Sequence, residues 1–259
     1  MAFVKLNAFV LLTFLSAACS QQAQAVNDVK NGSFEANSTA PVFWDQSGQT
    51  PQILPTFTVY DRDRNTVTIE AVDGNSFVML KTGGGTSTTW YSQLTQIIDV
   101  NVGESIAGVY FFATNDWMPQ WNDTADIYLS SPEPNSVTGS YDIEILLAHK
   151  DVNSVVHYGG IPGGSMKDWG RFSYTFGVSG TYTLVLSVKD AIDYSYASYL
   201  AVDALRITAG PPPPLCAYKL TGDLNRDCKV DFIDFAKMAE HWRIDCNTEP
   251  VDTAACTPI

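Results

Sequence analysis

The sequence predicts a mostly β protein: a jelly-roll β-sandwich, followed by a small α-helical calcium-binding module. Short segments that alternate between apolar and polar residues recur through residues 26–210, separated by Gly, Asn, Asp and Pro. No long stretch there has the 3.6-residue periodicity of an amphipathic helix. The last 44 residues differ, because they hold four of the five cysteines and a run of regularly spaced acidic residues. The change in composition predicts two folding units.

Residues 1–25 have the features of a secretory signal peptide. Lys5 is the only charged residue among the first 27, an apolar stretch follows it, and Ala23-Gln24-Ala25 fits the A-x-A cleavage rule. The apolar stretch is too short to be a stable membrane anchor. We therefore expect cleavage after Ala25 and an extracellular or cell-surface location. The alternative is a lipoprotein attached to a membrane through Cys19.

Composition excludes one class of partner. The 259 residues carry a formal net charge of −13, whereas a nucleic-acid-binding protein needs a basic face. Hydrophobic residues make up 45% of the chain, which is enough to build a core. We therefore expect a folded protein with no nucleic-acid partner.

About eight short strands are expected in residues 26–210, and several show a clear two-residue alternation. Turn residues such as Asp73-Gly74-Asn75 and Ser179-Gly180 separate them. Eight antiparallel strands in fewer than 200 residues favour a β-sandwich. The expected strands are 66–72, 76–80, 95–102, 105–114, 141–148, 171–176, 181–188 and 199–207.

The order of short motifs resembles the jelly-roll carbohydrate-binding modules of the galactose-binding-like superfamily. Asn31-Gly32-Ser33-Phe34-Glu35 opens the domain, Trp169-Gly170-Arg171-Phe172 lies near its end, and Tyr199 to Ile207 forms the last strand. The resemblance implies a structural calcium ion held by Glu35 and Asp203. Calcium prefers carboxylate and carbonyl oxygens, so the chemistry is suitable. The alternative is that both are ordinary turn and edge carboxylates.

Sugar binding needs exposed aromatic side chains on which pyranose rings can stack. Residues 115–123 place two tryptophans among Asn, Asp and Gln, a mixture too polar for a core strand. A second aromatic pair follows the turn Gly83-Gly84-Gly85. Trp44 and Trp169 lie nearer to expected strands and are assigned to the core. The candidate sugar-binding residues are Trp90, Tyr91, Trp117 and Trp121; the alternative for the last two is packing within their own loop.

Signals for catalysis are weak. Asp142 and Glu144 are two acids at i and i+2 that would share one face of a strand, but no further acid follows. His149 and His157 have no partner at the spacing of a metal site. We therefore expect no enzyme activity and no catalytic residue, with a hydrolase or lyase as the minority alternative.

Four prolines after Gly210 predict a stiff linker at residues 211–215, which separates the sandwich from residues 216–259. The segment from Gly222 onward then has the spacing of a calcium loop. Side chains with oxygen ligands stand at positions 1, 3, 5, 9 and 12, and position 7 offers a backbone carbonyl. These ligands are Asp223, Asn225, Asp227, Asp231 and Asp234, with Lys229 at position 7.

An Asp at position 12, in place of the usual Glu, makes the loop resemble the first half of a dockerin repeat. A helix over residues 232–243 would follow, with Phe235, Ala239 and Trp242 on one apolar face that we expect to be core. No second repeat is present, and Cys228 replaces the usual Gly at position 6. A cohesin-like partner therefore stays open beside simple surface attachment. The cysteines of an exported module this small are expected to form disulfides, whose pairing is open: Cys216, Cys228, Cys246 and Cys256.

These features together predict a secreted, non-catalytic protein. Its sandwich would bind a polysaccharide or cell-surface glycan, and its dockerin-like module would tether it with bound Ca²⁺. The main alternative is a structural or adhesion protein of the cell surface that has no sugar site.

Overall fold

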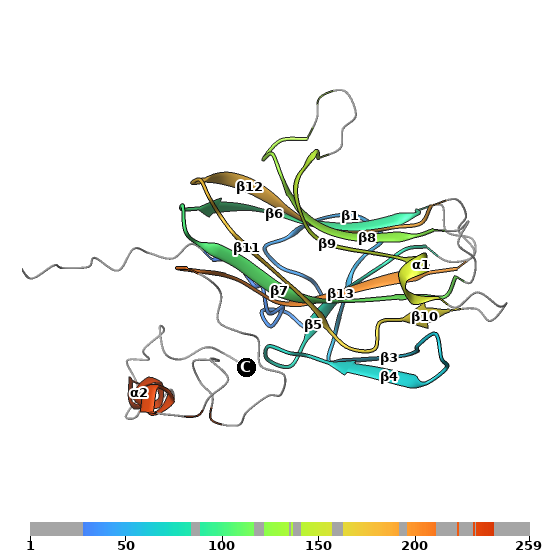
Figure 1. Cartoon of the computed structure of the whole chain (residues 1–259), viewed down its shortest axis with the longest axis horizontal. Coiled ribbons are helices and arrows are strands. Elements are labelled where there is room, and N and C mark those ends of the chain that lie inside the picture. Colours follow the sequence, from blue (N-terminus) through green and yellow to red (C-terminus); the bar gives the residue numbers. More distant parts are fainter. Residues whose placement is uncertain are drawn as a thin grey trace, which may run out of the picture.

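A computed structural model (Figure 1) describes residues 28–83, 89–116, 122–134, 136, 141–156, 163–191, 196–210, 222, 230 and 232–240. Two antiparallel sheets lie face to face, so the expected β-sandwich is confirmed. The leader, the proline linker and all five cysteines lie outside the described residues. One sheet has the order β1 (Asp45–Gly48), β6 (Tyr91–Val100), β12 (Gly180–Lys189), β8 (Thr124–Ser130), β9 (Ile143–Asp151).

The second sheet has six described strands, in which both β10 and β11 pair with β7. Its members are β10 (Gly164–Ser165), β7 (Ser105–Thr114), β13 (Ser198–Thr208), β5 (Phe77–Lys81), β2 (Gln52–Leu54) and β11 (Gly170–Thr175). A short helix, α1 (Val152–Val155), follows β9. The strands β3 (Thr56–Tyr60) and β4 (Thr66–Glu70) form a separate hairpin.

The core fills the space between the two sheets. Leu94 and Ile98 of β6 and Leu184 of β12 come from the five-stranded sheet and are almost completely buried. They meet Phe112 of β7 and Val202 of β13 from the other sheet in one cluster. Each strand contributes alternate residues, because successive side chains point to opposite faces of a sheet.

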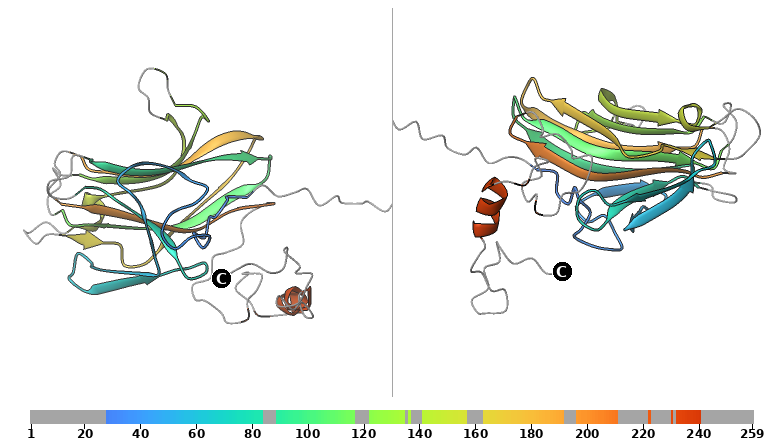
Figure 2. Two further views of the ribbon diagram at one scale, coloured as in Figure 1. Left: turned by 180° about the vertical axis from the view of Figure 1, so that it is seen from behind. Right: turned by 60° about the horizontal axis from the view of Figure 1, so that its bottom comes forward.

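The hairpin β3–β4 covers the outer face of the six-stranded sheet, as the right view of Figure 2 shows. Val67 and Ile69 of β4 belong to a second buried cluster with Phe77 and Phe111, which point away from the main core. Trp169 packs against the rings of Phe77 and Phe111 at centroid distances of 5.5 and 6.3 Å. The part of this sheet that β5, β7 and β13 form is therefore buried on both faces.

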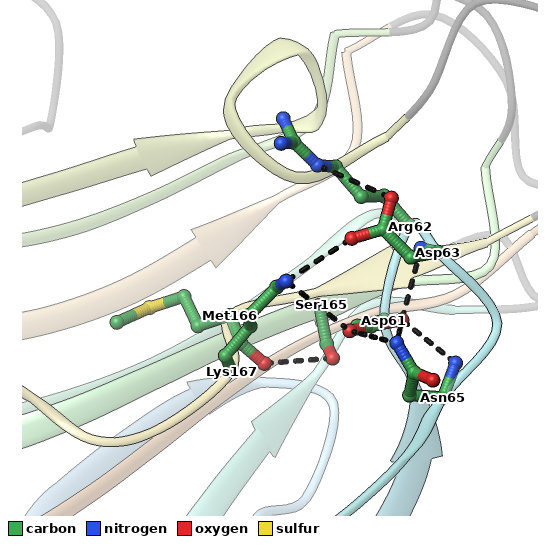
Figure 3. A network of polar contacts seen from close by, with 7 residues as sticks. All are labelled: Asp61, Arg62, Asp63, Asn65, Ser165, Met166 and Lys167. Atoms are coloured by element: carbon green, nitrogen blue, oxygen red, sulfur yellow. Dashed lines mark hydrogen bonds and ion pairs between the residues drawn. The ribbon is translucent and has the colours of Figure 1, made fainter.

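A polar network holds the tip of this hairpin (Figure 3). Lys167, which follows β10, lies 3.0 Å from the carboxylate of Asp63 and 3.9 Å from that of Asp61. Asp61 also accepts hydrogen bonds from the backbone N–H groups of Asp63 and Asn65. Burial opposes ionisation of Asp61, but the hydrogen bonds from Asn65 and Asp63, with the charge of Lys167, hold its pKa below the ordinary value. The ionised carboxylate thus organises the turn.

The N-terminal motif docks onto an irregularity in the last strand. The pairing of β13 with β7 shifts register between Asp203 and Arg206, and Ala204 there has a φ of +55°. The carbonyl of Gly32 accepts a hydrogen bond of 3.0 Å from the N–H of Leu205. Phe34 is fully buried and stacks on Trp44, 7% exposed, at a centroid distance of 5.7 Å. The expected core position of Trp44 is therefore confirmed.

In the C-terminal module the structure describes the helix α2 (Phe232–Glu240). It begins at the expected residue. The expectation that its apolar stripe is core is wrong for the described residues of that stripe: Phe235 is 54% exposed and Ala239 is exposed as well. Neither of the two core clusters contains a residue of α2, so the sandwich core closes without it. Trp242 lies outside the described residues. No described helix is long and apolar enough to cross a membrane.

Candidate functional site

The two sheets differ in what lies on their outer faces. The hairpin β3–β4 covers the six-stranded sheet, whereas no described helix or strand packs over the outer face of the five-stranded sheet. We call this outer face the open face. Its central residues, identified by their alternation with core residues, are Tyr91, Gln93, Thr95, Ile97, Asp126, Tyr128, Ser130, Thr183, Val185, Ser187, Lys189, Leu146 and His149.

Strand register arranges the open face in rows. One row consists of Gln93 on β6, Ser187 on β12, Asp126 on β8 and His149 on β9, each directly opposite the next. We call it the polar row. It places an amide, a hydroxyl, a carboxylate and an imidazole side by side, all of which can exchange hydrogen bonds with a ligand's hydroxyl groups.

The middle of the open face is buried although it points away from the core. Thr183, Val185 and Ser187 on β12 are at most 1% exposed, while Ile97 beside them is 60% exposed. The hydroxyl oxygens of Thr183 and Ser187 have no hydrogen-bond partner. A buried polar group without a partner destabilises the protein by about 1–3 kcal/mol. A ligand could bond to either hydroxyl only if the side chains around it moved apart, because both oxygens are almost inaccessible to solvent.

One contact and one buried phenol lie on the β8 and β9 side of the open face. The Nδ1 atom of His149 lies 2.7 Å from Oδ1 of Asp126, which joins β9 to β8 across the open face. Tyr128, next to Asp126 on the same face, is 6% exposed. Burial, with smaller contributions from Asp126 and Tyr141, raises the pKa of Tyr128 to about 12, so its phenol stays protonated and can donate.

The predicted pair Trp90 and Tyr91 stands at one end of the open face. Tyr91 begins β6 rather than lying in a loop, and it pairs with Lys189 in the same orientation as Gln93 and Thr95. Trp90 is 44% exposed and contacts the ring of Tyr91 edge to face at 5.7 Å. Tyr91 therefore lies on the same face as the polar row, two residues before Gln93 on β6, and Trp90 contacts Tyr91.

The second predicted aromatic pair, Trp117 and Trp121, lies outside the described residues. The acids that flank this loop are in the protein interior: Asp116 is 1% exposed and Asp123 is fully buried. Asp123 accepts hydrogen bonds from the N–H of Ala191 and the hydroxyl of Ser198, at 3.0 and 2.6 Å. These carboxylates organise the end of the sandwich and are not exposed to a sugar.

Glu35 and Asp203, the predicted calcium ligands of the sandwich, hold the same turn. Glu35 Oε1 accepts from the backbone N–H groups of residues 75 and 76, and Asp203 Oδ2 accepts from those of residues 72 and 73. Asp203 is fully buried. Burial raises its pKa to about 7, although backbone hydrogen bonds from Asp73, Ala204 and Val72 oppose the rise.

The residues around this turn fit a calcium ion in part. Two carboxylates bonded to the same turn are a suitable beginning. The described residues contain no group of three or more His, Cys, Asp or Glu side chains that could hold a metal ion. Calcium at Glu35 and Asp203 would therefore need backbone carbonyl oxygens for the rest of its coordination.

In the predicted C-terminal calcium loop, the structure describes one ligand residue. Asp234 lies in the first turn of α2 and is 3% exposed. Gly222, just before the loop, has a φ of +99°, which favours glycine. The other predicted ligands, Asp223, Asn225, Asp227, Lys229 and Asp231, lie outside the described residues.

Sequence reasoning missed the polar row. Its four residues come from β6, β8, β9 and β12, which span residues 91–189, and only the register brings them together. One signal was present: in β12, Thr183 precedes Leu184 and Ser187 follows Leu186, which places small hydroxyl residues on one face and leucines on the other. The acids considered for catalysis, Asp142 and Glu144, lie at the exposed start of β9, where the pairing with β8 is irregular.

Comparisons with known proteins give structural matches alone. No protein-family model matches the chain, and no curated protein matches it in sequence. TmCBM61, solved with β-1,4-galactotriose, is 13% identical, with a TM-score of 0.38, over 70% of this chain and 97% of its own. A xylan-binding domain from CBM 22 is 12% identical, with a TM-score of 0.31, over 73% of this chain and 99% of its own.

A third match is the enzymatically active domain of tailspike protein 4 from bacteriophage CBA120. It is 16% identical, with a TM-score of 0.34, and the match covers 70% of this chain but 21% of the tailspike chain. Two of the three are thus carbohydrate-binding modules. Because the identities are 12–16% and the TM-scores 0.31–0.38, the matches carry no argument about this chain's ligand or activity.

Proposed function

We propose that this chain binds a polysaccharide or other extracellular glycan through the open face of its five-stranded sheet. The observation that carries the proposal is the polar row, which sets Gln93, Asp126 and His149 side by side with Ser187 on a face that no described element covers. Trp90 and Tyr91 supply an aromatic surface for the C–H groups of a pyranose ring.

The wider setting is also a proposal. We infer an exported, non-catalytic protein whose C-terminal module binds calcium in a dockerin-like loop and tethers the sandwich, either to a cohesin-like partner or directly to a surface. Calcium at Glu35 and Asp203 would stabilise the turn that these carboxylates hold and would take no part in chemistry. The four C-terminal cysteines would form disulfides in this setting.

A glycan array probed with the full chain, with and without calcium, tests the binding function. Galactan and xylan are suitable first probes. We expect Trp90→Ala and Gln93→Ala each to weaken binding by about tenfold, a loss of about 1.4 kcal/mol. Tyr60→Ala is the matched control, because Tyr60 is an exposed aromatic residue, 58% exposed, on the hairpin β3–β4 across the molecule. Failure of every glycan to bind would refute the proposal.

A second candidate is an adhesion or structural role in which the open face contacts protein. It is favoured by three large apolar side chains on this face, Ile97, Ile143 and Leu146, which are 60%, 56% and 52% exposed. Such residues are common where a surface docks against another protein. An array without any glycan signal, together with self-association that Leu146→Ser abolishes, would support this role. Release of reducing sugar by the full chain would instead show a hydrolase.

A further inference from the structure

The charged groups of the open face are unevenly distributed. Asp45 on β1 stands opposite Thr95, and Asp99 and Asp126 lie on the same face, so three carboxylates surround its centre. Among the described residues of this face, Lys189 carries the single permanent positive charge, and it lies at the aromatic end. A further acid, Asp151, is engaged as the N-cap of α1.

The hydrogen-bonding groups of the polar row also favour ligands that donate hydrogen bonds. Oδ1 of Asp126 accepts a hydrogen bond from Nδ1 of His149 at 2.7 Å. The second oxygen of Asp126 is an acceptor as well, and Ser187 and the amide of Gln93 can accept in addition to donating. Sugar hydroxyls donate to such groups, whereas a carboxylate or sulfate group on a sugar cannot.

Because the polar row is partly buried, bringing a second negative charge next to Asp126 is unfavourable. Asp126 has a side-chain exposure of 20%, and its neighbour Ser187 is 1% exposed, so a ligand that reaches Ser187 displaces water from the carboxylate. A like charge brought to this place is not screened by solvent as it would be on an open surface. Contact with an anionic sugar would also bring two negative groups together on a face where Lys189, among the described residues, is the single permanent positive charge.

We propose that the open face selects neutral glycans and rejects anionic ones, with Asp126 and Asp45 as the residues that determine this specificity. The inference rests on the proposed glycan-binding function and narrows its ligand class. It requires a repulsive element as well as attractive contacts, which is how binding sites commonly discriminate between similar ligands.

The test compares each polysaccharide with its own charged derivative. Galactan, xylan and β-glucan are presented to the full chain as the neutral polymer and as its carboxymethyl derivative, and dissociation constants are measured at 0.1 M and 1 M NaCl. We expect the native chain to bind the neutral form at least about tenfold more tightly. The ratio should fall at 1 M NaCl, because salt screens the repulsion.

Two variants separate a local effect from the overall negative charge. Asp126→Asn and Asp45→Asn are expected to reduce the neutral-to-charged ratio severalfold. Glu70→Gln makes the same charge change on the exposed side of the hairpin β3–β4, across the molecule, and should leave the ratio unchanged. Equal or tighter binding of the carboxymethyl polymers by the native chain overturns the inference and leaves the glycan-binding function standing. Absence of binding to every polymer, neutral or charged, refutes both.

Discussion

A methyl group added at Gly32 should destabilise the sandwich strongly for so small a change. A Cβ atom built on Gly32 would lie 2.0 Å from the carbonyl oxygen of Leu205, and Cβ contacts below 3.0 Å are essentially absent from proteins. Gly32→Ala must therefore push the N-terminal segment away from β13 by about 1 Å. This displacement acts on the hydrogen bond between the Gly32 carbonyl and Leu205, and on Phe34, which is fully buried two residues later.

The expected magnitude follows from these two contacts. Forcing an extra methyl group into a packed site costs about 1–3 kcal/mol. Loss of the hydrogen bond to Leu205 adds about 0.5–1.5 kcal/mol. We therefore expect Gly32→Ala to lower the free energy of unfolding by roughly 2–4 kcal/mol, a large share of the stability of a typical domain.

Urea denaturation monitored by tryptophan fluorescence measures this change, because Trp44 stacks on Phe34 within the displaced segment. Gly177→Ala is the matched control: its Cβ would meet no atom within 4 Å, and its φ is not in the left-handed region. Ala at Gly177 should be neutral or slightly stabilising, by about 0.4–1 kcal/mol. Equal effects of the two substitutions would refute the idea that the N-terminal motif is fixed by its contact with β13.

Three further predictions concern separate parts of the sandwich. The pKa of Asp61 is lowered in the folded state, so its carboxylate stabilises the fold fully above the ordinary pKa of 3.8. This stabilisation is lost as the pH falls through the lower pKa of the folded state. Unfolding midpoints measured against pH should show the loss in the native chain and not in Asp61→Asn. Chelation of calcium should lower the melting temperature if Glu35 helps to hold an ion, and Glu35→Gln should reduce that difference. Phe77→Ala should cost about 3–5 kcal/mol, because the ring is fully buried, whereas Phe43→Ala, at a position 66% exposed, should cost far less in the same denaturation experiment.

Much of the fold could be predicted from the alternation of residues along the chain. The strand expected at 105–114 is β7 with the same limits, and those expected at 181–188 and 199–207 are β12 and β13 to within a residue or so. The missed strands are mostly short edge strands, such as β1 and β10, whose two to four residues are too few to show a period. β8 was missed for another reason: its residues follow the polar loop that we interpreted as a sugar site.

The candidate site could be predicted in composition but not in position. A single sequence shows which residues are neighbours along the chain, so it predicts aromatic residues beside amides within one loop but not across strands. Tyr91 was found in this way. Asp126 and His149 are 23 residues apart and meet because β8 pairs with β9 in one register, with two irregularities in the pairing. A register that contains bulges cannot be obtained from residue spacing alone.

The pattern of burial along the strands does indicate which sheet has an uncovered outer face. The outward residues of the central strands carry this information. β5 reads Phe-Val-Met-Leu, with four buried residues in succession, because the hairpin β3–β4 covers its outer side while the main core covers its inner side. In β6 burial alternates instead, with every second residue buried, as expected of a strand whose outer side has no described element over it. Continuous apolar strands and alternating strands in one chain therefore predict a sandwich with one covered and one open face. Applied to β12, the same rule accounts for Thr183 and Ser187, which stand where a doubly covered strand would have Val or Ile.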